Sequence, residues 1–369
     1  MPLPKPHITK DSFFHEVPSS SPSPSPPSYP TTIYFIPGNP GLISYYHAFL
    51  SLLGEKLSLD SGSNQKGRGS GFHVVGHSLA GFELEGGDGK ADGEEHYFDV
   101  EEQIRFVLGR LDGRLRGLRA ASGSLDGKSI EERPKPKVII IGHSVGTYLS
   151  MEMIRRHRER QAKAQTEGKH EDDDSDFKFD IIGGIMLFPT VMDIAASPSG
   201  RKLTLLLRII PHLALVASLF VKLLTALLPD SLTRTLIRLV MRNPPEDALD
   251  ATASFIQSKR GVRQALHMAT DEMRVISADK WDDDVWGLCT PEQRKPPNSM
   301  YFYFGRNDHW VAERTREDII SLRGNSKTKS GGAGPKMVVC EESVPHAFCL
   351  RHNETMAGKV AGMITEILE

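Results

Sequence analysis

Short apolar runs recur along the chain, and several of them lead through a glycine-containing turn into residues with helical spacing. The runs are rich in β-branched and aromatic residues, which predicts strands at 31–36, 72–75, 138–141, 180–188, 299–304 and 336–341. Apolar residues at helical spacing predict helices that end near 57 and 160 and helices at 98–118, 244–273, 311–323 and 353–368. Strands that alternate with helices indicate an α/β domain built on a mostly parallel sheet.

This alternation stops between residues 190 and 298, where helical patterns follow one another. The insertion, 191–297, has the size and position of a helical cap over the strand ends. We therefore predict a core formed by 31–190 and 298–369 and a cap formed by 191–297. Residues 1–30 end in a Pro/Ser-rich run and are expected to be a disordered, extended lead-in.

The most apolar part of the cap is the stretch 203–228, whose 26 residues are long enough to span a bilayer as one helix. Its 16 Leu, Ile, Val and Phe residues contribute roughly −8 kcal/mol to insertion, at about −0.5 kcal/mol each. Arg208 and Lys222, at about +3 kcal/mol each, cancel most of that before Pro211 and His212 are counted. A single spanning helix is therefore marginal.

Other arrangements of 203–228 fit better, and they are not mutually exclusive. The stretch could form a pair of cap helices hinged at Pro211 that covers an acyl-binding cleft, or simply the buried core of the cap. It could also lie in a lipid monolayer as a hairpin, with Arg208 and Lys222 reaching the headgroups. In that case the residues expected to contact lipid are Leu205, Ile209, Leu215, Leu219, Phe220 and Leu224.

Composition narrows the class of protein. Apolar residues make up 39% of the chain and charged residues 25%, which is typical of a globular protein. The net charge of −2 gives no indication of nucleic-acid binding. Cys289, Cys340 and Cys349 are too few and too irregular for a disulfide framework or a zinc site, and the acidic run 172–174 lacks the spacing of a calcium loop. The first residues, MPLPKPHITKD, have no apolar core, so no signal peptide is expected.

The motif with the clearest chemistry is Gly-His-Ser-Val-Gly at 142–146, between the strand at 138–141 and a helical pattern. G-x-S-x-G in that context predicts a nucleophile elbow, in which a tight turn lifts the hydroxyl of Ser144 above the strand ends. The glycines keep Cβ atoms out of the crowded turn. The peptide N–H of Val145, at the helix start, would then point at a developing oxyanion. Ser78 lies in a similar sequence, but Ala80 replaces the second glycine and no helix follows, so it is not expected to be catalytic.

Two further residues complete a candidate triad. Asp308 follows the strand at 299–304 in a glycine-containing loop, and His346 follows the last strand. The order Ser144, Asp308, His346 is that of α/β-hydrolase triads. The alternatives are that Asp308 caps the next helix and that His346 is a surface histidine. The turn Pro37-Gly38-Asn39-Pro40-Gly41 lies where such folds place a second oxyanion donor, and Asn39 is chosen because Pro40 has no N–H.

With these motifs identified, the chain resembles the lipid droplet-associated hydrolase family. The resemblance is carried by IPGNPG with Tyr45-Tyr46, GHSVGTY, LFPT followed by SPSG, FGRNDHWV and PHAF, and it spans about 31–368. Polar insertions at 58–71, 82–95 and 159–178 suggest a fungal-like member. The resemblance implies an α/β-hydrolase fold and Ser144, Asp308 and His346 as nucleophile, acid and base. It also implies residence at lipid droplets or associated endoplasmic reticulum, on the cytosolic face, and hydrolysis of lipid esters, with sterol esters the usual proposal.

The mechanism expected from these residues is acyl transfer without a metal or an organic cofactor. An acyltransferase or thioesterase would use the same triad, and the sequence does not separate it from an ester hydrolase. A weakly catalytic protein of the droplet surface, with 203–228 supplying its function, is a further alternative. Expected partners are a lipid ester substrate and a droplet monolayer or membrane surface, with no nucleic acid and no metal.

Overall fold

The computed structural model describes residues 3–19, 29–60, 71–85, 90–91, 94–122, 135–166, 179–288, 299–324 and 334–369. Eight strands form one sheet in the order β1-β2-β4-β3-β7-β8-β9-β10. Their bounds are β1 His7–Ile8, β2 Ser12–Val17, β3 Thr31–Ile36, β4 Phe72–His77, β7 Lys137–His143, β8 Asp180–Leu187, β9 Ser299–Phe304 and β10 Lys336–Val339. A separate pair, β5 Lys90–Ala91 and β6 Glu94–Glu95, is antiparallel. From β4 to β10 all neighbouring strands of the large sheet are parallel, as predicted.

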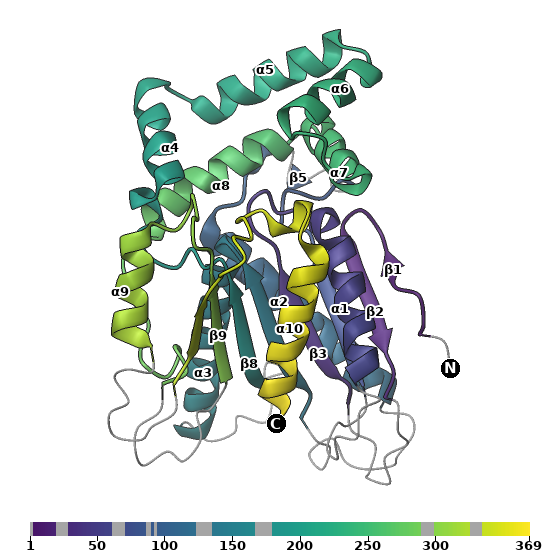
Figure 1. Ribbon diagram of the computed structural model, residues 1–369, viewed down its shortest axis with the longest axis vertical. Helices are drawn as coiled ribbons and strands as arrows, with labels where there is room; N and C mark the ends of the chain where they lie inside the picture. Colours follow the sequence, from purple (N-terminus) through teal and green to yellow (C-terminus); the bar gives the residue numbers. More distant parts are fainter. Residues whose placement is uncertain are drawn as a thin grey trace.

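Helices cover both faces of the sheet (Figure 1). On one face lie α2 Val100–Ser122, α3 Val145–Thr166 and α9 Glu313–Arg323, and on the other lie α1 His47–Asp60 and α10 Asn353–Leu368. Side chains alternate along each strand, so that Tyr34 and Ile36 of β3 join the first layer while Ile33 and Phe35 join the second. This double burial explains why the strands are almost continuously apolar.

The N-terminal residues differ from the expectation. Residues 1–30 were predicted to be a disordered lead-in, but β2 pairs antiparallel with β4 and fully buries Phe13. The prediction is wrong for this segment because only alternate residues of β2 are buried, and one of them is His15. A short, half-buried strand with a buried histidine gives a weak apolar signal. The Pro/Ser-rich run at 20–28 lies outside the described residues.

The segment predicted as the cap, and called the cap below, contains the helices α4 Pro198–Ile209, α5 Leu213–Leu227, α6 Asp230–Val240, α7 Glu246–Gln257 and α8 Gly261–Val275. The predicted single helix at 244–273 is divided at Ser258, whose hydroxyl accepts a hydrogen bond from the N–H of Gly261 and so begins α8. Figure 1 shows the five helices above one end of the sheet, with α8 between α5 and the strands.

The predicted hinge at Pro211 is confirmed, because α4 and α5 meet there at 92°. Proline lacks the N–H that a continuous helix needs, and it disfavours helical backbone in the residue before it. In the part of the chain that is described, no single helix is long and apolar enough to cross a membrane. Among the described helices, one bent pair, α4 with α5, reaches the required length and composition when the two are taken together.

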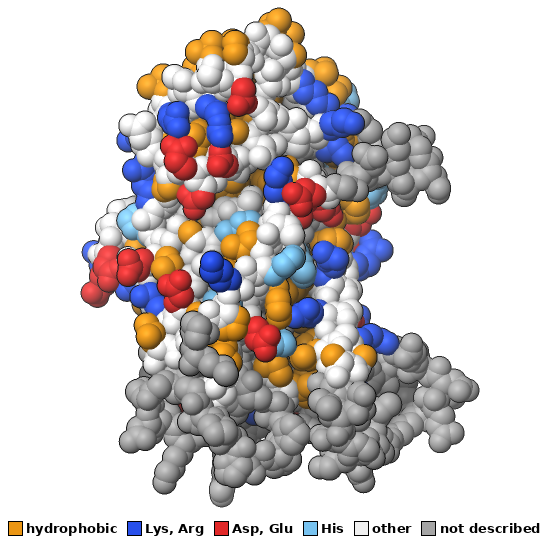
Figure 2. All heavy atoms as spheres, turned by 90° about the vertical axis from the view of Figure 1, so that its right-hand side faces the viewer, with side chains coloured by type: hydrophobic (Ala, Val, Ile, Leu, Met, Phe, Trp, Pro, Cys, Tyr) orange, Lys and Arg blue, Asp and Glu red, His pale blue; other side chains and the backbone are white. Residues whose placement is uncertain are grey.

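The apolar side chains of α4 and α5 face outward. All six residues expected to contact lipid are exposed, with exposed fractions from 37% for Leu224 to 64% for Ile209. Figure 2 shows hydrophobic side chains gathered over the end of the molecule where these helices lie. The interpretation of 203–228 as the buried core of the cap is therefore wrong for these side chains. Buried apolar residues of the cap lie instead on α6, α7 and α8 and in the chain before and after the five helices, among them Ile237, Leu249, Met268, Ile194 and Trp286.

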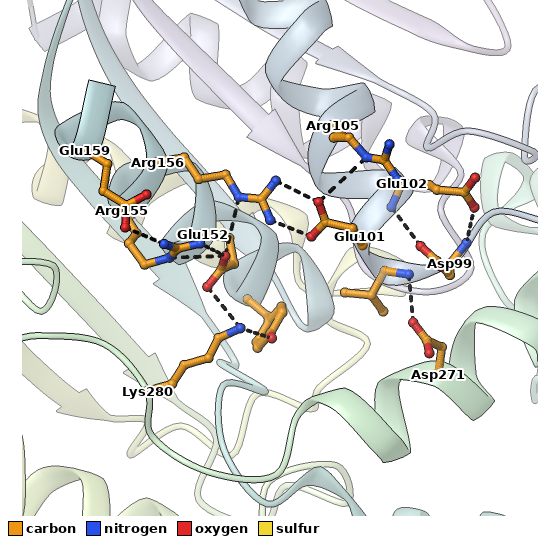
Figure 3. A network of polar contacts seen from close by, with 12 residues as sticks. Asp99, Glu101, Glu102, Arg105, Glu152, Arg155, Arg156, Glu159, Asp271 and Lys280 are labelled. Atoms are coloured by element: carbon orange, nitrogen blue, oxygen red, sulfur yellow. Dashed lines mark hydrogen bonds and ion pairs between the residues drawn. The ribbon is translucent and has the colours of Figure 1, made fainter. Parts of the chain in front are cut away.

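Polar side chains attach α8 to the core. Gln264, fully buried, accepts a hydrogen bond from the peptide N–H of Phe98 and donates one to its carbonyl. The carboxylate of Asp271 accepts the N–H of Val100 at 3.0 Å, at the start of α2. Figure 3 shows Asp271 directed toward that helix end.

The chain that leaves the cap is held by a second polar cluster, drawn in Figure 3. Glu152 of α3, whose side chain is 2% exposed, lies between Arg155, Arg156 and Lys280. Oε2 contacts both arginines, while Oε1 contacts Lys280 and also accepts the indole N–H of Trp281 at 2.8 Å. Because Lys280 and Trp281 follow α8, both ends of this helix are fixed against the helices that cover the sheet.

Candidate active site

Ser144 stands in the turn between β7 and α3, in left-handed backbone with φ of 55°. A Cβ on Gly142 would lie 2.5 Å from the carbonyl oxygen of Gly146, and one on Gly146 would lie 2.3 Å from that of Ile36. Only glycine fits at these two positions, which is the steric reason for the G-x-S-x-G spacing. The predicted strand, tight turn and helix are therefore all present.

His346 lies between Ser144 and Asp308. Its Nε2 is 2.9 Å from Oγ of Ser144, and its Nδ1 is 2.9 Å from each carboxylate oxygen of Asp308. A carboxylate only accepts, so Nδ1–H donates to Asp308 and leaves Nε2 to accept the serine proton. The structure thus brings together three residues that are far apart in the sequence.

Asp308 is held by its own loop. Its side chain is 2% exposed, and Oδ1 accepts the peptide N–H groups of Trp310 at 2.8 Å and Val311 at 3.3 Å. The alternative, that Asp308 merely caps the following helix, does not hold, since α9 begins at Glu313 and its N-cap residue is Ala312. These donors fix the carboxylate in the plane where it meets the imidazole.

The two residues predicted as oxyanion donors lie beside Ser144. Val145 is the first residue of α3, so its N–H has no carbonyl one turn earlier within the helix. In the loop 37–41, Pro37 and Pro40 have no N–H, and the N–H of Gly38 donates to the hydroxyl of Tyr46. Of the first four residues of that loop, only Asn39 keeps a peptide N–H for a ligand. This loop passes so close to the elbow that a Cβ added to Gly38 would lie 2.9 Å from Cβ of Ser144.

A cavity of about 530 Å³ opens on Ser144 and His346. It lies under the cap, and its wall is mostly apolar, with Leu203, Met241, Ala265, Leu266, Trp310 and Leu350 among the lining residues. Apolar walls with a few polar groups are typical of sites for small apolar molecules. Leu203 and Ala265 belong to α4 and α8, so the cap forms part of the wall.

Glu272 is a lining residue that the sequence did not reveal. Burial with no cation beside it raises its pKa to about 8, although a hydrogen bond from Asn39 at 2.8 Å opposes that rise. At neutral pH this shift favours the protonated carboxyl group. The side-chain amide of Asn39 also donates to the carbonyl of Ala265 at 2.9 Å, so α8 holds the loop that carries Asn39. An acidic residue in an amphipathic helix is expected to face solvent, so the sequence pattern gives no sign that Glu272 is buried.

The other groups considered from the sequence lie elsewhere. Ser78 is buried, and its hydroxyl donates to Asp11 at 3.2 Å, away from the cavity. In the described part of the chain, no three His, Cys, Asp or Glu side chains are grouped so that they could hold a metal ion. The acidic run 172–174 and Cys289 lie outside the described residues, while Cys340 and Cys349 are buried and unpaired by disulfide.

Known proteins of one family resemble this chain over most of its length. The model of the family described as lipid-droplet associated hydrolase matches residues 29–349. The lipid droplet-associated hydrolase of Mus musculus is 26% identical over 336 residues, which cover 90% of this chain and 84% of that protein. The protein of the same name from Dictyostelium discoideum is 25% identical over 334 residues, 89% of this chain and 86% of the relative.

Solved structures give the fold. A 2-hydroxy-6-oxo-6-phenylhexa-2,4-dienoate hydrolase from Rhodococcus superposes with a TM-score of 0.51 at 14% identity, covering 98% of this chain and 100% of that one. A laboratory-evolved variant of potato epoxide hydrolase gives 0.50 at 13% identity, covering 98% and 99%. These likenesses confirm the predicted α/β-hydrolase fold. Because the family model matches residues 29–349, which are most of this chain, the chain belongs to the lipid-droplet associated hydrolase family.

Proposed function

We propose that this protein is a serine hydrolase of lipid carboxylic esters, sterol esters among them, that acts at the surface of lipid droplets. The observation that carries the proposal is the hydrogen-bonded series Ser144, His346 and Asp308, with 2.9 Å at each step, in the floor of an apolar cavity. The family to which the chain belongs is named for droplet association and hydrolysis.

In the proposed reaction, Nε2 of His346 removes the proton from Ser144 as Oγ attacks the ester carbonyl. The N–H groups of Val145 and Asn39 stabilise the tetrahedral oxyanion. Asp308 holds the imidazole in the correct tautomer and stabilises its protonated form. His346 then protonates the departing alcohol, and water releases the acid from the acyl-enzyme by the same steps.

The outer surface of the cap supports the place of action. Exposed leucines of α4 and α5 continue onto α6, where Leu232, Leu236, Leu239 and Val240 are also exposed. An apolar patch of this extent indicates a binding surface. Arg208 and Lys222 stand among these side chains, as expected where an apolar face enters lipid and its cations reach the headgroups. A droplet monolayer is the proposed partner, with the membrane of the endoplasmic reticulum as a second surface of the same chemistry.

The experiment that tests the chemistry is labelling of purified protein by a fluorophosphonate probe, with detergent or lipid present. Wild type, Ser144→Ala and Ser78→Ala are compared. We expect labelling that is lost only in Ser144→Ala, because Ser78 lies outside the cavity. Folded wild-type protein that fails to label would reject the proposed hydrolase, and loss of labelling in Ser78→Ala alone would reject Ser144 as the nucleophile.

A second candidate, a droplet-surface protein with little catalysis, is favoured by the exposed apolar patch alone. Comparing wild type with Ser144→Ala in cells separates the two functions. If both proteins reach droplets and droplet lipid content changes only with wild type, the hydrolase function accounts for the biology. Equal lipid content with both would favour the surface function.

A further inference from the structure

One series of hydrogen bonds joins the three loops that carry the candidate site. The N–H of Gly38, in the oxyanion loop, lies 3.3 Å from the hydroxyl oxygen of Tyr46. That oxygen lies 2.8 Å from Nδ1 of His143, the residue before Ser144. Nε2 of His143 lies in turn 2.9 Å from the carbonyl oxygen of His346. None of these contacts takes part in the proton transfers described above.

The direction of each bond follows from the groups involved. A carbonyl oxygen only accepts, so Nε2 of His143 must carry a hydrogen and donate it to His346. In a neutral imidazole the other nitrogen is then an acceptor, which means that Tyr46 donates its hydroxyl hydrogen to Nδ1. The oxygen of Tyr46 is left to accept the N–H of Gly38. The Cys349 thiol is a further hydrogen-bonding neighbour of the Tyr46 hydroxyl. The hydrogen bond donated to His346 determines the tautomer of a neutral His143.

The surroundings keep both side chains in these forms. Tyr46 and His143 are each 4% exposed, and burial holds the pKa of His143 well below its usual 6.5 and that of Tyr46 well above 10. The neighbouring His346 imidazole also lowers the pKa of His143. Aromatic rings surround the imidazole of His143, with ring centroids of Phe348 at 5.1 Å and Phe188 at 5.8 Å. Both side chains border the cavity, but at 4% exposed they meet little solvent that could replace a lost partner.

We propose that Tyr46 and His143 are positioning residues that set the main chain of His346 and hold the oxyanion loop in register with it. The proposal rests on the function proposed above, because it assumes that His346 is the base. It assigns a role to two residues whose side chains need not touch the reacting atoms. The hydrogen bonds place the base and the second oxyanion donor relative to the imidazole of His143. A displacement of the His346 main chain therefore also displaces the oxyanion loop, and the reverse.

The test compares Tyr46→Phe and His143→Leu with His143→Gln. The phenylalanine variant removes the donor to His143 and the acceptor for Gly38, while the leucine variant removes the donor to His346. The glutamine variant restores that donor, because its side-chain amide nitrogen reaches the position of the imidazole Nε2. Matched controls are Tyr34→Phe, which removes a buried hydroxyl bonded to the carbonyl of Val107, and His157→Leu, which removes a buried histidine in the second half of α3.

Two readouts are measured beside the melting temperature of each variant. The first is the rate of fluorophosphonate labelling at Ser144. The second is the low-field proton resonance of the His346 Nδ1–H donated to Asp308, which requires no substrate. We expect Tyr46→Phe and His143→Leu to label about 10- to 100-fold more slowly, as for an ångström-scale displacement of a catalytic group. Their low-field resonance should shift or broaden, whereas His143→Gln and both controls should keep the wild-type signal.

The outcomes separate this proposal from the one on which it rests. Wild-type protein that shows the low-field resonance but no labelling would reject the proposed hydrolase. The positioning role would be rejected if wild-type protein labels and if Tyr46→Phe and His143→Leu keep both its labelling rate and its low-field resonance. The same rejection follows if the variants slow labelling only as much as controls of equal melting temperature, or if His143→Gln is as slow as His143→Leu.

Discussion

Two cap helices of equal length, α5 and α8, pack against each other with opposite burial. The helix α5 has 15 residues, mostly apolar, yet the only one it buries is Ser218. The helix α8 also has 15 residues, and those it buries include Gln264, Asp271 and Glu272. In ordinary globular helices the apolar side chains are inside and the polar ones outside. Here the outer helix has the reverse arrangement, and the inner helix buries polar side chains that have defined partners.

This difference in burial indicates different roles for α8 and α5. The polar groups of α8 bind particular atoms of the core, at Phe98, Val100 and Asn39, so the helix has one position. The apolar side chains of α5 form no hydrogen bonds, and they lower the free energy of any arrangement that removes them from water. We therefore expect α8 to determine the shape of the cavity and α5 to determine where the protein resides.

The largest effect should come from making the outer helix polar. Replacing Leu219, Phe220 and Leu223 by Ser removes three exposed side chains worth about 1.5–3 kcal/mol each when they enter lipid. We expect the affinity for phospholipid-coated oil droplets, measured by flotation, to fall by roughly a thousandfold or more. Leu322→Ser, at an exposed leucine of α9, is the control and should float like wild type. Flotation of the triple variant at the wild-type level would place the lipid contact elsewhere.

The next effect tests the attachment of the inner helix. Gln264→Ala removes two buried hydrogen bonds and leaves the N–H and carbonyl of Phe98 without partners, so the free energy of unfolding should fall by about 2–4 kcal/mol. Urea denaturation measures this change. Gln257→Ala, at an exposed glutamine bonded to Asp230, should cost less than about 0.5 kcal/mol. Equal losses in both variants would contradict the distinction between the inner and outer layers.

Glu272 makes the stability of the inner helix depend on pH. Its pKa rises from 4.5 to about 8 on folding, because it is buried and Asp271 lies beside it. Below pH 4.5 both states hold the proton. Between these values the unfolded chain ionises and the folded one does not, so stability falls as pH rises, by at most about 1.4 kcal/mol per unit.

The substitution Glu272→Gln removes this dependence. Relative to wild type, we expect it to gain about 1–3 kcal/mol between pH 5 and pH 8 in urea denaturation. Glu246→Gln, at an exposed residue paired with Arg238, serves as the control and should show a constant offset. A constant offset for Glu272→Gln as well would mean that the carboxyl is ionised in the folded protein.

The smallest effect concerns the cations of the outer layer. Neutralising Arg208 or Lys222 with Gln should weaken binding to vesicles containing phosphatidylserine by about 1 kcal/mol each, and the loss should shrink in high salt. Lys137→Gln, at an exposed lysine at the start of β7, should bind like wild type. Losses of equal size on uncharged vesicles would show that these side chains act by packing alone.

Sequence patterns predicted the features that depend on residues close together in the chain. The six parallel strands of the large sheet, the elbow at Ser144 and the order of Asp308 and His346 follow from apolar runs, glycine positions and loop placement. The short pair β5 and β6 was not predicted, because its residues are polar or small. Three other features did not follow from such patterns. The strand β2 has too few apolar residues to stand out, and α5 is apolar on every side, so its sequence does not say which face meets solvent. The roles of Glu272 and His143 depend on contacts between segments far apart in the chain.

The right-angle bend between α4 and α5 has a consequence for catalysis on a surface. A single helix resting on a monolayer can roll about its own axis, and whatever it carries rolls with it. The helix α4 leaves α5 at 92° and runs toward the strands, so α5 cannot roll on the surface without swinging α4 and the core with it (Figure 1). Because α4 also lines the cavity, docking through the pair would present that cavity to the lipid at one fixed tilt. Substrate would then arrive by diffusion in two dimensions to an entrance whose height above the monolayer does not vary.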